Sequence, residues 1–229
     1  MTLLRHMHKP INFVLIGRSG CGKGTQAKLL MEHFGNLFYI SAGHLFRKLA
    51  EYDTQVGHKV KDVLNNGGLQ FNYLATMLWV SEISYNLKED QCFCLDGAPR
   101  RIEEAKMLDD FLQYFDRKES TMIILLDISR QEASDRLTKR RICKNCGQLI
   151  PWVGDYKNLQ ACDKCGGDLE ERADDTPEAI KNRLDYFDKD VSKVIKYFQK
   201  KKRLVKINGE QPIEKVFGDI LTEIRKRND

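Results

Sequence analysis

The amino-acid sequence predicts an α/β fold in which helices cover both faces of a five-stranded parallel sheet. Five short apolar runs suit buried strands and alternate with stretches that have the 3.6-residue spacing of amphipathic helices, a pattern typical of parallel sheets. The first run also leads directly into a glycine-rich phosphate-binding motif, a P-loop, which occurs between a strand and a helix. The 229 residues, 41% of them hydrophobic, suffice for one large domain with insertions.

The P-loop follows the apolar run 12–16 and matches the pattern GxxxxGK[ST] from Gly17 to Thr25. Glycines let successive backbone N–H groups face one anion, and the helix that begins there presents its positive end to the same point. Lys23 is expected to reach the β- and γ-phosphates of a nucleotide, and Thr25 to contact a bound Mg²⁺. An accidental glycine-rich turn is the alternative, which the flanking strand and the apolar-periodic helix disfavour.

The next elements alternate in the same way. The run 37–40 predicts a second strand, and Ser41 is placed to cap the helix that follows it. Helical spacing from Leu45 to Trp79 is interrupted by turn residues at 65–68, which indicates two or three short helices inserted between strands. The run 92–95 predicts a third strand, and the loop after it lies where ligands gather in open parallel sheets.

The second half of the chain supplies two more predicted strands. The run 122–128 is continuously apolar and suits a strand covered on both faces, and a helix is expected from Gln131 to about Lys139. Helical periodicity is absent from 143–165 and returns after a start signal at 174–178 that contains an early proline. That helix is expected to continue to Phe198, before a last strand and a closing helix.

Two Cys-x2-Cys pairs, fifteen residues apart, have the spacing expected of a four-cysteine zinc site. Each pair is followed by a glycine, Gly147 or Gly166, which eases the tight turn beneath the sulfurs. Because four ligands complete a tetrahedral site, we expect a closed structural Zn²⁺ site with no position for a catalytic water. Disulfides or idle thiols are the alternative, which the absence of a secretion signal disfavours. The predicted ligands are Cys143, Cys146, Cys162 and Cys165.

Charge and hydropathy restrict the kinds of partner that the protein can have. The net charge of +5 suits either nucleic acid or a phosphate-rich small substrate, and no run of eighteen uncharged apolar residues is present, so a soluble, cytoplasmic protein without a membrane partner is expected. Several arginines at element ends suit phosphate oxygens, whereas Arg18, Arg101 and Arg203 are expected to be solvated surface charges.

A P-loop protein whose zinc ribbon binds nucleic acid is a further hypothesis, although Trp152 and Tyr156 make a poor stacking platform.

Five motifs in one order resemble those of the adenylate kinase family, in its form with a long zinc-bearing lid: GRSGCGKGTQ, ISAGHLFR, LDGAPR, RLTKRRICKNCG and ERADDTPEAIKNRL. The resemblance spans nearly the whole chain. It implies a core of residues 1–41, 73–137 and 174–229, an insertion at 42–72 that binds a nucleoside monophosphate, and a zinc-binding lid at 138–173. It further implies a monomer that, with Mg²⁺, transfers the γ-phosphoryl group of ATP to AMP.

The resemblance also assigns site residues, position by position. For ATP they are Gly20, Cys21, Gly22, Lys23, Gly24, Thr25, Arg136, Arg140 and Gln211. For the acceptor they are Ala42, Arg47, Leu69, Gln70, Gly97, Arg100, Glu104, Arg172 and Arg183. The residues expected to act in catalysis are Lys23, Arg100, Arg136, Arg140, Arg172, Arg183 and Asp96, the last as a holder of Mg²⁺ or its water. Since the acceptor phosphate is already an anionic nucleophile, no general base is required.

The acceptor site departs from the family pattern at Ala42, His44 and Ala98, and above all at Glu104, where the family has a glutamine that reads adenine. An ionised glutamate only accepts hydrogen bonds, while adenine offers one donor and one acceptor on that edge and guanine offers two donors. GMP is therefore the leading alternative acceptor. Equally open is a Glu104 that turns to solvent, pairs with Arg101 or binds protonated.

Overall fold

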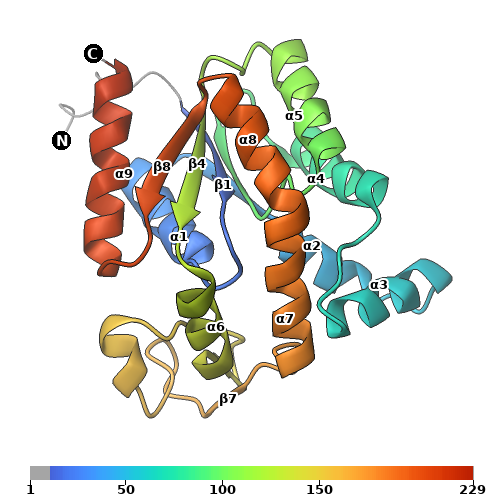
Figure 1. Ribbon diagram of the computed structural model, residues 1–229, viewed down its shortest axis with the longest axis vertical. Coiled ribbons are helices and arrows are strands. Elements are labelled where there is room, and N and C mark those ends of the chain that lie inside the picture. The colour runs from blue at the N-terminus through green and yellow to red at the C-terminus, as the bar shows by residue number, and fades with distance from the viewer. Residues whose placement is uncertain (1–10, 229) are drawn as a thin grey trace.

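The computed structural model describes residues 11–228, so residues 1–10 and 229 of the expected core lie outside the described range. Within that range, five parallel strands form one sheet in the order β2-β3-β1-β4-β8, which confirms the predicted fold class (Figure 1). The strands are β1 (Asn12–Ile16), β2 (Leu37–Ser41), β3 (Cys92–Asp96), β4 (Thr121–Asp127) and β8 (Leu204–Asn208).

Helices follow the strands as the spacing predicts. The Ser41 hydroxyl accepts from His44 N at 3.3 Å and that of Thr176 from Ala179 N at 3.2 Å, so each caps the helix that follows it. The helices are α1 (Lys23–Phe34), α2 (Ala42–Leu49), α3 (Gln55–Asn65), α4 (Asn72–Asn86), α5 (Ile102–Tyr114), α6 (Arg130–Lys139), α7 (Pro177–Tyr186), α8 (Ser192–Lys200) and α9 (Ile213–Asn228).

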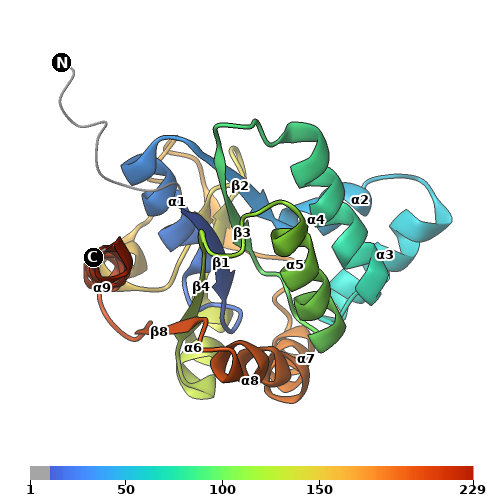
Figure 2. The same cartoon turned by 90° about the horizontal axis from the view of Figure 1, so that it is seen from above.

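The sheet is buried on both faces because successive side chains of each strand point to opposite sides. In β1, Phe13 and Leu15 pack in one cluster with α1 and α9, whereas Val14 and Ile16 pack in the other with α4, α5 and α8. Figure 2 shows these two groups of helices on opposite sides of the sheet. All four side chains are at most 3% exposed. The sheet is thus fixed rigidly, with the carboxyl ends of its strands at one edge.

A second, small sheet lies beyond α6, in the lower part of Figure 1. Three antiparallel strands of two or three residues are ordered β6-β5-β7, and a 3-10 turn, η1 (Gly154–Asn158), accompanies them. The strands are β5 (Arg141–Cys143), β6 (Leu149–Ile150) and β7 (Leu169–Glu171). Sequence patterning predicted no strand here, since runs this short have no measurable alternation.

The helix expected from 176 to 198 is interrupted. A π-helical turn, η2 (Phe187–Val191), joins α7 to α8 and buries Phe187 and Val191 in the core. A π-turn inside a helix inserts an extra residue and occurs often at functional sites. Periodicity did not reveal it, because Val191 and Val194 keep an apolar spacing that also fits an uninterrupted helix.

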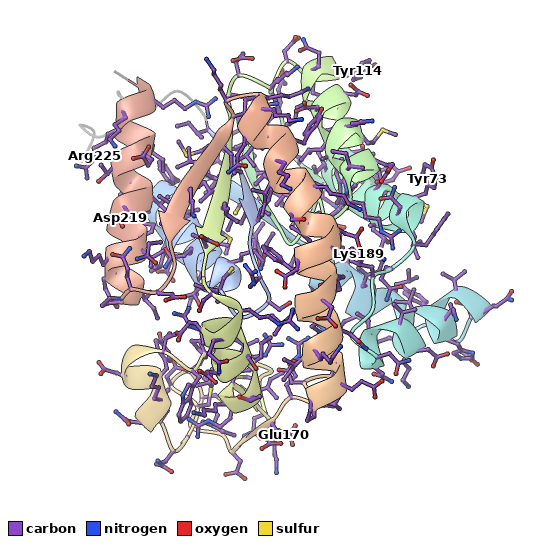
Figure 3. The ribbon with its side chains drawn as sticks, viewed as in Figure 1. Tyr73, Tyr114, Glu170, Lys189, Asp219 and Arg225 are labelled. Atoms are coloured by element: carbon purple, nitrogen blue, oxygen red, sulfur yellow. The ribbon has the colours of Figure 1, made fainter. Side chains whose placement is uncertain are left out.

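The interpretation of Arg18 and Arg203 as solvated surface charges is wrong. Each side chain is only 16% exposed and reaches a carboxylate on another element: Arg18 contacts Asp188, and Arg203 contacts the buried Asp109. Long arginine stems can cross between elements and bury their length, which sequence position alone does not disclose. Other charges do lie on the outer faces, as Figure 3 shows for Lys189.

Among residues 11–228, no helix combines the length and the apolar composition that a membrane span requires.

Candidate active site

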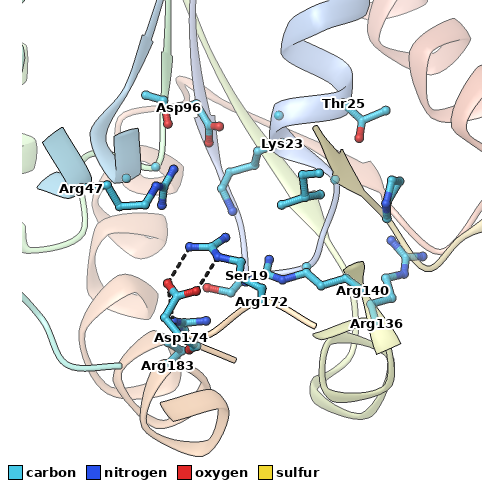
Figure 4. A pocket seen from close by; sticks show the side chains of 18 of the residues that line it. Ser19, Lys23, Thr25, Arg47, Asp96, Arg136, Arg140, Arg172, Asp174 and Arg183 are labelled. Atoms are coloured by element: carbon cyan, nitrogen blue, oxygen red, sulfur yellow. Dashed lines mark hydrogen bonds and ion pairs between the residues drawn. The ribbon is translucent and has the colours of Figure 1, made fainter. Parts of the chain in front are cut away.

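A cavity of about 520 Å³ opens at the carboxyl ends of β1 and β3. The P-loop forms one wall, and the remaining walls come from α2, the turn after α3, α6, the small sheet and α7 (Figure 4). Most of the predicted site residues meet here although they are spread over the chain. Those that line the cavity are Gly20, Gly22, Lys23, Gly24, Thr25, Arg47, Gln70, Asp96, Gly97, Arg100, Arg136, Arg140, Arg172 and Arg183.

The P-loop presents the beginning of α1 to this cavity. The first turn of α1 contains no acidic residue, so its backbone N–H groups and helix dipole keep their positive character. The Lys23 ammonium donates to the carbonyl oxygens of Gly17 at 2.8 Å and Arg18 at 2.9 Å. Lys23 therefore lies against its own loop, near the middle of the cavity in Figure 4.

Three arginines from the far wall share two aspartates. Asp175 accepts from Arg140 Nη2 at 2.6 Å and from Arg183 Nη1 at 2.5 Å, and its side chain is only 5% exposed. Asp174 accepts from Arg172 Nη2 at 2.6 Å and lies 3.1 Å from Arg183 Nη2. Burial alone would raise the pKa of Asp174, but the charges of Arg172, Arg183 and Arg140 hold it below its usual value. Asp174 therefore stays ionised, and the hydrogen bonds to the two aspartates fix the guanidinium planes.

Three other cations of the cavity carry no such neutralising partner. Within the described range, no carboxylate lies within salt-bridge distance of Lys23, Arg47 or Arg100. Arg100 instead donates to the Gly97 carbonyl at 2.7 Å and to the Tyr186 hydroxyl at 2.9 Å. Three unneutralised positive groups around one P-loop give the cavity a strong attraction for a multiply charged anion.

Oxygen groups suited to Mg²⁺ lie at the same edge of the sheet. Thr25 stands in the first turn of α1 and Asp96 ends β3, and both line the cavity. The Asp96 Oδ2 atom accepts from the Tyr39 hydroxyl at 2.8 Å, and burial together with the Asp96 charge raises the pKa of Tyr39. Tyr39 thus remains a protonated donor that orients Asp96. A hydroxyl and a carboxylate fit the oxygen preference of Mg²⁺.

The four predicted zinc ligands form one cluster, with all their sulfurs within 4.8 Å of one another. Cys143 Sγ lies 3.5 Å from Cys165 Sγ, and Cys146 Sγ lies 3.6 Å from Cys162 Sγ. The glycine after each pair has a φ of 69° or 71°, a left-handed turn that a residue with a Cβ would strain. Backbone N–H groups of Cys146 and Asn145 lower the pKa of Cys143 to about 7. Four thiolate donors at this spacing fit a tetrahedral Zn²⁺ ion.

Comparison with known proteins agrees with this geometry. The family model described as adenylate kinase matches residues 15–203. The chain belongs to the adenylate kinase family. It is 38% identical to an adenylate kinase of Methanocella arvoryzae over 94% of this chain and 99% of that protein. It is also 37% identical to one of Geobacillus sp. strain WCH70, over 92% and 96%, and 34% identical to one of Clostridium perfringens, over 92% and 96%. The chain is therefore a phosphotransferase of the nucleoside monophosphate kinase class.

The Glu104 side chain is neither in solvent nor ion-paired with the Arg101 side chain. Its side chain lies in a small second pocket and is 3% exposed, where Oε1 accepts from Trp79 Nε1 at 3.2 Å and Oε2 accepts from Arg100 N at 2.7 Å. Burial raises the pKa of Glu104, although these two donors oppose the shift. The same pocket contains the predicted acceptor residues Ala42 and Leu69.

Two residues assigned to ATP do not line the cavity. Cys21 is buried beneath the loop at 3% exposure, so only its backbone is available to a phosphate. Gln211 is assigned only a backbone contact to the ATP base, and its side chain is engaged elsewhere: Nε2 donates to Asn208 O at 2.9 Å and to Asp219 Oδ2 at 2.8 Å.

Sequence reasoning missed two tyrosines of the site. Tyr186 accepts from Arg100, and Tyr39 donates to Asp96. Tyr186 lies three residues after Arg183 on one helix, so i,i+3 spacing could have placed it on the cavity face. No comparable signal marks Tyr39, whose contact depends on the pairing of β2 with β3.

Proposed function

We propose that this chain catalyses the reversible, Mg²⁺-dependent transfer of the γ-phosphoryl group of ATP to AMP, giving two molecules of ADP. The observation that carries the proposal is the division of cations in the cavity. Lys23, Arg47 and Arg100 remain unneutralised around the P-loop, while the arginines of the opposite wall are oriented by Asp174 and Asp175. Such an arrangement suits two phosphate chains brought together end to end.

The residues divide the work by position. Backbone N–H groups at the start of α1 and the Lys23 ammonium would bind the β- and γ-phosphates, with Arg136 and Arg140 beside them. Four arginines would hold the acceptor phosphate and the group in transfer: Arg47, Arg100, Arg172 and Arg183. Mg²⁺ bound with ATP, held at Thr25 and through water at Asp96, would neutralise charge on the phosphate oxygens. Positioning and charge stabilisation then suffice for the reaction.

Two segments are proposed to move during the cycle. Residues 42–72, which include α2 and α3, would close on the acceptor, and residues 138–173, which carry the cysteine cluster, would close on ATP. Trp152 and Tyr156 of the latter segment line the cavity. This placement supports a lid over a nucleotide better than an outward platform for nucleic acid. The enzyme is proposed to act as a monomer.

The acceptor base is tested by a panel. With ATP as donor, AMP is expected to give a higher kcat/KM than GMP, CMP or UMP in a coupled assay, because the relatives matched are adenylate kinases. A rate with GMP equal to or above that with AMP would overturn the assignment of AMP. That result would favour the guanine alternative, whose two donors suit an ionised carboxylate.

Glu104→Gln sharpens the same test. Replacing one carboxylate oxygen by NH2 loses the hydrogen bond from either Trp79 or the Arg100 backbone but supplies a donor to N1 of adenine, whose lone pair the carboxylate repels. The variant is therefore expected to raise kcat/KM for AMP by up to about tenfold and to lower any turnover of GMP. The matched control is Glu103→Gln, which makes the same change at the exposed neighbouring position of α5 and should leave both values unchanged. A lower kcat/KM for AMP in Glu104→Gln would show that Glu104 acts only through Trp79 and the Arg100 backbone.

A further inference from the structure

Arg18, the second residue of the P-loop, does not point toward the nucleotide side of the loop. Its Nη2 atom lies 2.5 Å from Asp188 Oδ1, and its Nη1 atom donates to the Ile128 carbonyl oxygen at 3.2 Å. The guanidinium carbon lies 4.3 Å from the centre of the Phe187 ring. The side chain therefore joins the phosphate-binding loop to the π-helical turn η2 by an ion pair and a cation–π contact.

The helix that Arg18 reaches carries groups of the proposed site. Arg183, one turn before η2, is fixed by Asp175 and Asp174, and Tyr186, the residue before Phe187, accepts from Arg100 at 2.9 Å. A π-turn changes the register between the helical segments on either side of it. The position of η2 therefore determines the positions of Arg183 and Tyr186 relative to the cavity. Arg18 holds η2 at that place.

At its P-loop end, this link also lies next to a phosphate-binding group. The Arg18 carbonyl oxygen accepts from the Lys23 ammonium at 2.9 Å. One residue thus contacts the phosphate-binding lysine through its backbone and the arginine-bearing helix through its side chain. Misplacement of reacting groups by about 1 Å can reduce a rate about 10²-fold, so such a link has kinetic consequences.

We propose that Arg18 is a positioning residue, which keeps the P-loop and α7 in register so that Lys23 and Arg183 meet the same phosphoryl group. The inference rests on the proposed phosphoryl transfer. It differs from a direct phosphate contact, because both terminal nitrogens of Arg18 are engaged by Asp188 and Ile128 O and its guanidinium lies over the Phe187 ring. It also differs from a merely stabilising ion pair, for which the chain offers a control.

That control is Arg130. Its Nη1 atom lies 2.8 Å from the other oxygen of Asp188 and its Nη2 atom 2.6 Å from Asp185, and it belongs to α6 rather than to the P-loop. Arg130→Ala therefore removes an ion pair to the same carboxylate without touching the phosphate-binding loop. If the pair only stabilised the helix, loss of either arginine would have similar effects.

The experiment compares Arg18→Ala, Arg18→Lys, Arg130→Ala, Asp188→Asn and the double variant Arg18→Ala/Asp188→Asn, measuring kcat, both KM values and Tm. Arg18→Ala is expected to lower kcat about tenfold with KM for ATP changed less than about threefold, and Arg130→Ala to stay within about twofold of wild type. Arg18→Lys should recover part of the loss. The double variant should be no slower than Arg18→Ala, because both changes break the Arg18–Asp188 pair and the loss of the Arg130–Asp188 pair is expected to have little effect.

Three outcomes would overturn the proposal. They are a kcat of Arg18→Ala within about twofold of wild type, an equal loss in Arg130→Ala, and a raised KM for ATP at unchanged kcat, which would indicate direct phosphate binding. Should Arg18→Ala fail to fold, Asp188→Asn tests the same link from the helix side, and wild-type kcat in that variant would count against it. Absence of turnover in the wild-type protein would instead refute the proposed function, so the two failures are distinguishable.

Discussion

Replacing Arg100 by alanine is expected to lower kcat about 10²- to 10³-fold, the loss typical of removing one charged donor from a developing phosphoryl or oxyanion centre. The guanidinium is available for this role because its partners, the Gly97 carbonyl and the Tyr186 hydroxyl, are neutral. Steady-state kinetics with both nucleotides varied would measure the change. Near-wild-type turnover would show that Arg100 is assigned the wrong role.

Stability separates this loss from simple misfolding. Arg100→Ala removes two hydrogen bonds, each worth about 1 kcal/mol, which corresponds to a fall in Tm of only a few degrees in a chain of this size. Lys106→Ala is the matched control, because it removes one positive charge from an exposed position on the helix that follows Arg100. It should leave kcat unchanged.

The division between neutralised and unneutralised cations suggests an order of importance among the arginines. Arg140, Arg172 and Arg183 are held by Asp174 and Asp175, so each is pre-oriented but partly neutralised. Pre-orientation reduces the entropy lost when a phosphate binds, since the guanidinium planes are already fixed. The unpaired cations supply the net charge, and the paired ones supply geometry.

The parts of the site that could be predicted are those encoded in contiguous residues. The spacing within the P-loop is set by phosphate binding, and that of the two Cys-x2-Cys pairs by metal coordination. The pair Thr176-Pro177 is a typical helix start, and α7 begins there. The parallel direction of the strands could also be predicted, because alternating strands and helices give a parallel sheet. These features depend on local chemistry, which the sequence contains directly.

What could not be predicted depends on contacts between distant segments. Arg18 and Asp188 are 170 positions apart, and Glu104 meets the Trp79 indole across two helices. A side chain with several rotatable bonds can point into solvent, contact another residue or bind a ligand, and only the tertiary structure determines which of these it does. The π-turn at Phe187–Val191 was not predicted for a related reason: the apolar residues there have a spacing that also fits a regular α-helix.

The four-cysteine cluster is proposed to hold Zn²⁺, and removal of that ion is expected to lower the Tm of the protein by about 5 to 10 °C. A ligand present at about 100 times its Kd stabilises the folded state by about 2.7 kcal/mol, and each kcal/mol shifts the Tm of a domain of this size by about 2 to 4 °C. The small sheet has strands of only two or three residues, so its order depends on the sulfurs being held together. Thermal unfolding after chelation, with bound zinc quantified per chain, would measure the effect.

Two comparisons test whether that metal is structural. Cys146→Ser removes one ligand and should reproduce the fall in Tm, whereas Cys21→Ala, a buried cysteine outside the cluster, should leave the metal content unchanged. Because four thiolates leave no coordination position for water, refilling the site with Cd²⁺ or Co²⁺ should restore stability and leave kcat within about twofold of the zinc form. A metal-free protein of unchanged Tm would contradict the structural role, and a kcat that follows the identity of the metal would indicate that the ion takes part in the chemistry.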